Sequence, residues 1–196
     1  MKNKNQMKKL AYYLLFVIGF VFINGCGNET TINDDEAASV ISNYLEEKPE
    51  YKTADFIFGE MKFRQIKDQE ELNKYKALEK SGFISMSLKE QKKVFLSKDS
   101  TLVYLITLTE KSAPFVLKQR NDKAQVKTIF YVMDNDKPVN FVKTNESSAK
   151  VTVTLVKMET DFYPFDDDQG SNSEFITKTF KLKHKKDKGW VVTGEN

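Results

Sequence analysis

Cys26 is the only cysteine of the chain, so its thiol is the one side chain with strong nucleophilic and redox chemistry. The stretch before it, residues 10–23, is 14 residues long and largely apolar. Four lysines lie ahead of that stretch: Lys2, Lys4, Lys8 and Lys9. Because a helix needs about 20 apolar residues to cross a bilayer, this run is short for a permanent membrane span. The basic segment, the short apolar segment and the small residue Gly25 together predict a secretory signal that is cleaved before Cys26.

The tetrad Ile23-Asn24-Gly25-Cys26 resembles the lipobox of bacterial lipoproteins, with Asn24 more polar than the Ala or Ser common there. The resemblance implies that residues 1–25 are removed and that the Cys26 thiol carries diacylglycerol, with acyl chains such as palmitate. Two or more chains give stable attachment to a membrane. We therefore expect a lipid-anchored, extracytoplasmic protein of the cell membrane or the outer membrane. A plain secretory signal and an uncleaved N-terminal helix are the alternatives.

The net charge of the chain changes sign when the predicted signal is removed. The full sequence carries +3 at pH 7, from 31 basic and 28 acidic residues. The four lysines of the signal leave with it, so 27 basic residues remain against 28 acidic ones and the net charge becomes −1. Nucleic-acid-binding domains are typically basic, and we therefore expect no nucleic-acid partner. Once Cys26 is modified, no disulfide or cysteine metal site is expected either.

The mature chain is predicted to begin with a tether and a helix. Residues 26–33 are short and polar, and we expect them to link the lipid to the folded part. Asn33 and Glu36 have the spacing of a capping box. Apolar residues recur behind them at helical spacing until Pro49, which predicts an amphipathic helix that ends there.

A second helix is predicted by Asp68 and Glu71 at its start and by Gly82 at its C-terminal end. Ahead of it, apolar residues alternate around Gly59, which predicts two strand segments joined at a bulge or kink. Residues 70–117 resemble a winged-helix unit, in which a helix ends in a Gly-apolar step and a two-stranded wing leads into a final helix. A generic arrangement of helices on a sheet is the alternative.

From residue 83 onward the pattern is mainly that of β-strands. We expect strands over 83–88, 93–97, 102–109, 125–133, 139–143, 150–159, 175–182 and 190–193. The sequence therefore predicts an α+β fold, in which two N-terminal helices with strands over 34–118 precede a mainly antiparallel sheet over 124–194. The two portions form one domain or two. Val153, Phe180 and Trp190 are predicted to lie on the buried face of that sheet, from their size and alternation.

His184 is the only histidine, and it lies among lysines near a turn. One histidine cannot supply a multi-histidine zinc site, and neighbouring lysines disfavour its protonated form, so we expect a surface residue. The lysines around it are candidates for contact with anionic lipid headgroups or cell-wall polymers. Protection of a sheet edge against aggregation is the alternative. These lysines are Lys181, Lys183, Lys185, Lys186 and Lys188.

Residues 161–174 are predicted to form a loop that is both acidic and aromatic. Oxygen-rich loops bind calcium, but the sixth position counted from Asp166 is Ser171, where an EF-hand requires glycine. We therefore predict no metal site from this spacing. Phe162, Tyr163 and Phe165 are candidates for a partner contact, because aromatic residues are enriched at interface hot spots. Attachment of the loop to its own core is the alternative.

Signatures of catalysis are scarce in the sequence. It holds no Gly-x-Ser-x-Gly nucleophile elbow and no glycine-rich phosphate loop, and no cofactor is expected. The leading hypothesis is a non-catalytic binding or accessory module of the cell envelope, which contacts an envelope protein or polymer. One alternative is an envelope hydrolase that uses a carboxylate pair. Another is a carrier of a small apolar ligand, which needs a sizeable internal cavity.

Overall fold

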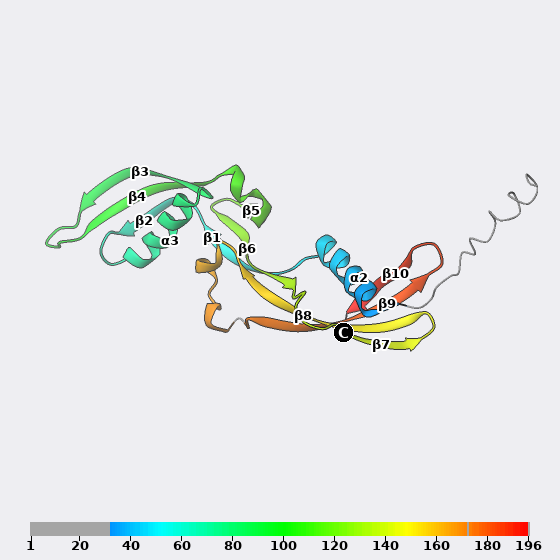
Figure 1. Ribbon diagram of the computed structural model, residues 1–196. Coiled ribbons are helices and arrows are strands. Elements are labelled where there is room, and N and C mark those ends of the chain that lie inside the picture. Colours follow the sequence, from blue (N-terminus) through cyan, green and yellow to red (C-terminus); the bar gives the residue numbers. More distant parts are fainter. Residues whose placement is uncertain (1–31, 172, 196) are drawn as a thin grey trace, which may run out of the picture.

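Two antiparallel sheets make up most of the chain in this computed structural model, which describes residues 32–171 and 173–195. The predicted α+β class is confirmed. The molecule is elongated, with helix α3 (Gln69–Lys80) and a small sheet at one end (Figure 1). Helix α2 (Asp34–Glu47) lies towards the other end, beside the C-terminal strands. The predicted signal, Cys26 and most of the tether lie outside the described residues.

The larger sheet has seven strands. Along its main path the order is β1 (Glu50–Ile57), β6 (Lys123–Met133), β8 (Ser148–Glu159), β9 (Phe175–Lys185) and β10 (Gly189–Glu195). β5 (Val116–Arg120) pairs with the first half of β6, and β7 (Asn140–Asn145) pairs with the first half of β8. The second halves of β6 and β8 pair with each other. These two long strands therefore connect the two ends of the molecule.

The smaller sheet has the order β2 (Gly59–Arg64), β4 (Ser100–Leu108) and β3 (Ile84–Lys93). Helix α3 contacts β2 and β3. Leu72, Tyr75 and Leu78 recur at helical spacing and are all buried, so this face of the helix covers the sheet. Gly82 follows the helix with a φ of +80°, the left-handed conformation predicted for its C-terminal end.

Helix α2 packs on the larger sheet and builds the first hydrophobic core. The side chain of Asn33 accepts a hydrogen bond from the Glu36 backbone N–H at 2.8 Å and caps the helix. The helix buries Ala37, Ile41 and Leu45. In the same core lie the three sheet residues that were predicted to be buried: Val153, Phe180 and Trp190. That prediction is confirmed, because alternation along a strand separates a buried face from an open one.

The second core is dominated by aromatic rings, and Phe56 of β1 is at its centre. The centroid of its ring lies 4.9–5.4 Å from those of Tyr75, Phe162 and Phe165. The ring of Phe83 joins them through Phe162, at a centroid distance of 5.7 Å. The Phe56–Tyr75 pair is tilted and the other three pairs are edge-to-face, and aromatic pairs contribute about 0.5–1.5 kcal/mol each beyond the burial of their surface. The rings join β1, α3 and the loop after β8 into one unit.

Both cores take residues from either side of the connection near residues 118–124. The core under α2 combines this helix with β8, β9 and β10. The aromatic core combines β1, α3 and β3 with Ala124, Val126 and Phe162 from later in the chain. Helices α2 and α3 therefore belong to different cores although they are close in sequence.

Three elements differ from the expectation. The strand predicted over 93–97 is wrong, because β3 ends at Lys93 and residues 94–97 form the tip of the β3–β4 hairpin, where Phe95 and Leu96 are exposed. Strand β5 lacks a clear apolar alternation and was not predicted. The predicted side-chain cap at Asp68 is also wrong, since its carboxylate instead accepts a hydrogen bond from the Arg64 backbone N–H at 2.6 Å.

The winged-helix likeness over 70–117 is not confirmed. After β4 the chain forms a short 3₁₀-helix, Glu110–Phe115, and then enters the larger sheet as β5. The final α-helix of a winged-helix unit is therefore missing from this described segment. In addition, β4 pairs on its second edge with β2, which precedes helix α3 in the chain.

Gly59 lies where the chain leaves one sheet and enters the other. Its φ is +88°, and a Cβ atom built on it would approach the Cβ of Asp122 at 3.4 Å. The Phe58 backbone N–H donates to the Asp122 carbonyl oxygen at 2.8 Å and fixes this crossing. The predicted kink around Gly59 is confirmed, since β1 and β2 follow each other directly yet pair in different sheets.

We expect Gly59→Ala to lower the free energy of unfolding by about 1–2 kcal/mol, because a left-handed backbone crowds the new Cβ. Urea denaturation followed by circular dichroism measures the change. Gly194→Ala is the matched control, since nothing lies within 4 Å of its Cβ position and its φ is not positive. Equal losses in the two variants would contradict the special role of Gly59.

Candidate functional site

The loop between β8 and β9 folds back onto the aromatic core. Phe162 is fully buried, whereas Tyr163 and Phe165 are half-buried. The Phe162 ring fills the core, as in the alternative of a loop attached to its own core, and has no exposed surface for a partner in this fold. The Tyr163 hydroxyl donates to the Gln169 carbonyl oxygen at 2.9 Å, which holds the loop in a compact shape. Phe165 keeps part of its ring accessible and lines a cleft.

Asp166 connects the same loop to β6. The hydroxyl of Thr128, itself fully buried, donates to one carboxylate oxygen at 2.7 Å. The backbone N–H of Asp168 donates to the other oxygen at 2.9 Å. Asp166 is buried, and these bonds replace the water that its carboxylate has lost. These two hydrogen bonds therefore hold the acidic loop together and against β6, next to the cleft.

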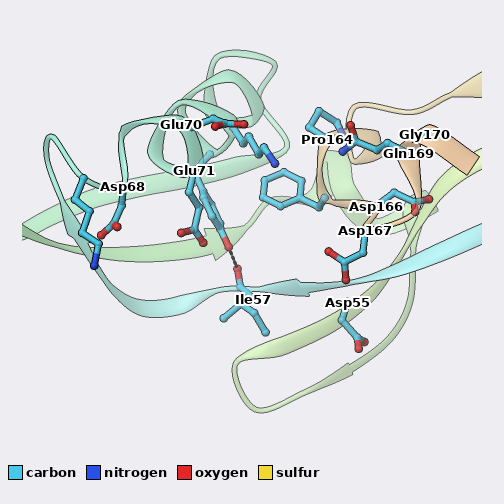
Figure 2. A pocket seen from close by; sticks show the side chains of 14 residues that line it. Asp55, Ile57, Asp68, Glu70, Glu71, Pro164, Asp166, Asp167, Gln169 and Gly170 are labelled. Atoms are coloured by element: carbon cyan, nitrogen blue, oxygen red, sulfur yellow. Dashed lines mark hydrogen bonds between the residues drawn. The ribbon is translucent and has the colours of Figure 1, made fainter.

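A cleft of about 700 Å³ lies between this loop and helix α3. Figure 2 shows that its walls come from elements far apart in sequence: Asp55 from β1, Glu71 from α3 and Asp167 from the loop. The Tyr75 hydroxyl donates to the Ile57 carbonyl oxygen at 2.9 Å at the base of the cleft (Figure 2). Burial, assisted by the charge of Glu71, raises the pKa of this hydroxyl, which therefore stays protonated as a donor.

Acidic residues predominate around the cleft. They are Asp55, Asp68, Glu70, Glu71, Asp166 and Asp167. Two lysines, Lys67 and Lys74, also line it, and Asp55 forms an ion pair with Lys123 at 2.8 Å. The recess therefore combines negative charge with the ring of Phe165. Such a surface attracts cationic groups.

Sequence reasoning identified the loop wall of this cleft but missed the wall formed by β1 and α3. Glu70 and Glu71 lie in the first turn of α3, where acidic residues stabilise a helix through its dipole. Because helix stabilisation already explains their position, the sequence gives no reason to assign these two residues to a cleft. The sequence signal in the described segments was that each of them is rich in acidic and aromatic residues. This composition does not predict which segments lie side by side in the fold.

The predicted lysine cluster forms an exposed basic face on the C-terminal strands. Lys181, Lys183 and Lys185 occupy alternate exposed positions of β9, so they point to the same side. Lys150 of β8 lies directly opposite Lys181 in the sheet register and is exposed as well. The remaining two lysines, Lys186 and Lys188, lie at the exposed turn before β10. The opposite face of these strands is the one that helix α2 covers.

His184 lies on the covered side of β9 rather than with the lysines. It is half-buried, and its ring lies 5.5 Å from that of Trp190 in an edge-to-face arrangement. The expectation of a plain surface residue therefore needs correction, because His184 packs against the edge of the first core. The contact with Trp190 therefore gives His184 a role in packing.

Two carboxyl groups of the described chain have clearly shifted pKa values, and both are lowered. Burial opposes the ionisation of Asp99, but backbone N–H donors, with the Arg64 guanidinium beside them, outweigh it and lower its pKa. The Lys178 ammonium, with a hydrogen bond from Tyr44, lowers the pKa of Glu195. A general acid at neutral pH needs the opposite shift. Neither group supports the hydrolase alternative.

Within residues 32–171 and 173–195, no three His, Cys, Asp or Glu side chains are placed to hold a metal ion. No helix in this part of the chain has the length and apolar character to cross a membrane. No protein-family model, curated protein or solved structure matches the chain. Its function therefore has to be inferred from its residues and their geometry.

We expect Phe162→Ala to lower the free energy of unfolding by about 3–5 kcal/mol, because it leaves a cavity among aromatic rings. Thermal and urea denaturation measure this loss. The matched control is Phe95→Ala, which removes the same side chain from a site that is 88% exposed and is expected to cost less than about 0.5 kcal/mol. A small loss for Phe162→Ala would restore this ring as a candidate for partner contact.

Proposed function

We propose that the protein is a lipid-anchored, extracytoplasmic binding module of the cell envelope with no catalytic role. The order of lysines, short apolar run and Cys26 supports the anchor, and the polar residues after Cys26 supply a tether. The module would hold its cleft close to a membrane and recruit a partner there.

The basic face supports contact between this end of the module and the anchoring membrane. The tether leads into Asn33 and helix α2, which packs against β7 and β10. Lys150, Lys181 and Lys183 therefore lie on the same end of the molecule as the tether. Each lysine near an anionic surface contributes about 1 kcal/mol of attraction. The like-charged pair of Lys150 and Lys181 destabilises the sheet, and an anionic partner would offset that cost.

The cleft beside α3 is the observation that carries the binding role. It lies in the half of the molecule away from α2, the helix that directly follows the tether in the sequence (Figure 1). Its acidic rim and the accessible part of the Phe165 ring fit a cationic segment of an envelope protein or a polymer with cationic groups. No observation in the described chain specifically favours the hydrolase or the apolar-carrier alternative. The cleft is lined mainly by charged side chains, which an apolar ligand would have to desolvate.

We expect Cys26→Ala to abolish incorporation of a labelled fatty acid and to release the protein from the membrane fraction, because the thiol is the attachment point. Metabolic labelling and membrane fractionation in a bacterial host measure both effects. Ser39→Ala, on the exposed side of α2, is the control that retains the label. Labelling that survives Cys26→Ala would contradict the anchor.

We expect crosslinking of the wild-type protein in native membranes to recover one stoichiometric partner through the cleft. The double variant Glu70→Lys/Asp167→Lys reverses two exposed cleft charges and should reduce recovery at least about tenfold, since it repels a cationic ligand. Quantitative mass spectrometry of the captured material measures the loss. Glu36→Lys/Glu47→Lys reverses two exposed charges of α2 and serves as the matched control. Recovery that is unchanged by the cleft variant would contradict this site.

A further inference from the structure

The β3–β4 hairpin presents two large apolar side chains to solvent at its tip. Phe95 and Leu96 are 88% and 92% exposed, the highest values among the exposed large apolar residues of the described chain. Figure 1 shows the tip at the extreme end of the molecule, beyond helix α3 and opposite the end that carries α2. Turns of this kind normally hold Gly, Asn, Asp or Ser, which interact well with water. The apolar residues here therefore have no explanation in the hairpin itself.

The backbone at the tip supports the same conclusion. Leu96 has a φ of +54°, a left-handed conformation that bulky residues rarely adopt. Gly or Asn would form this turn with less strain. The turn nevertheless places a leucine here, with its side chain in solvent. An unfavourable residue held at an exposed site is typical of a position used for contact.

Hydrogen bonds fix the base of the tip, so its shape exists before any ligand binds. The Val94 backbone N–H donates to the Asp99 carbonyl oxygen at 3.0 Å, and the Ser97 N–H donates to the Val94 carbonyl oxygen at 3.1 Å. The Asp99 carboxylate accepts from the Ile66 N–H at 2.8 Å and pairs with Arg64 at 3.2 Å. Asp99 is buried, so it adds no negative charge to the surface of the tip.

A collar of positive charge surrounds the apolar tip. Between residues 89 and 98 there are four lysines and one acidic residue, a net charge of +3. The lysines are Lys89, Lys92, Lys93 and Lys98, and all four are exposed. Glu90 is the acidic residue, and it pairs with Lys92 at 2.6 Å. The other lysines have no ion pair within the described residues, so their charge faces outward.

We infer that the tip Val94–Leu96 inserts into the surface of a lipid bilayer that carries anionic headgroups. Phe95 and Leu96 would enter the boundary between headgroups and acyl chains, where apolar side chains lose their contact with water. The collar would remain at the level of the headgroups, because lysine keeps its ammonium in the polar layer and is attracted by anionic lipid. Charge complementarity favours this occupant over an uncharged protein groove, which would accept the apolar tip but would gain nothing from the lysines on both sides of it.

This contact does not depend on the proposed lipid at Cys26. Both described cores begin at or after Ile32, so a chain of residues 27–196 keeps every described contact while lacking the anchor. The hairpin tip also lies at the opposite end of the molecule from helix α2, which directly follows the tether in the sequence (Figure 1). Failure of one attachment can therefore be told apart from failure of the other.

The test is co-sedimentation of residues 27–196 with vesicles of phosphatidylcholine that contain roughly one-third phosphatidylglycerol. We expect binding to these vesicles and little binding to pure phosphatidylcholine. Phe95→Asp/Leu96→Asp should weaken binding at least about tenfold, because it removes the apolar insertion without touching the core. Phe175→Asp, at a residue that is 64% exposed on β9, is the matched control and should bind like the wild type.

A second measurement reports insertion directly. Phe95→Trp places a fluorophore at the tip, and its emission should shift to shorter wavelength and be quenched by brominated lipid. Trp190, the only other tryptophan, is buried in the first core and gives a constant background. Three results would overturn the inference: no vesicle binding, binding unchanged in the double aspartate variant, or a tip that captures a protein while ignoring vesicles. The second of these would point to the basic face of β9 instead.

Discussion

The ring of Phe56 makes the contacts on which the arrangement of the two sheets depends. It belongs to β1 of the larger sheet, yet it packs against Tyr75 of α3 and against Phe162 and Phe165 of the late loop. The chain crosses between the sheets at Phe58-Gly59 and again through the 3₁₀-helix Glu110–Phe115, and these short backbone connections alone do not hold the sheets firmly together. The packed aromatic rings supply the rigid connection. Their burial also keeps the connection dry, which strengthens its few polar contacts.

The cleft is a product of the same packing. Phe162 and Phe165 follow each other closely, and one ring enters the core while the other borders the recess. The Thr128–Asp166 hydrogen bond then fixes the loop against β6. The shape of the cleft and the stability of the fold are therefore coupled, since any change that loosens the loop also removes a wall of the cleft. The exposed acidic residues at the rim, such as Glu70 and Asp167, contribute to the charge of the cleft but not to this packing.

Features determined by neighbouring residues could be predicted from the sequence. The cap at Asn33, the kink at Gly59 and the buried alternation of β8 all have local causes, and the structure agrees with them. Features determined by distant contacts could not be predicted in this way. Nothing local shows that α2 packs on the last strands, or that α3 and the late loop face each other. Apolar character at Phe95 and Leu96 predicted a strand because a hydrophobic pattern does not tell a buried run from an exposed one.

The packing of α2 on the last strands also has a consequence for the order of folding. The helix begins at residue 34, but its core is complete only when Phe180 and Trp190 are present. Contacts between the two ends of a chain form slowly, because closing a long loop costs entropy before the contact is made. A polypeptide that emerges N-terminus first would therefore keep helix α2 without its partner strands until almost all of the chain had been made. Until those strands have been made, the apolar face of α2 remains exposed to solvent.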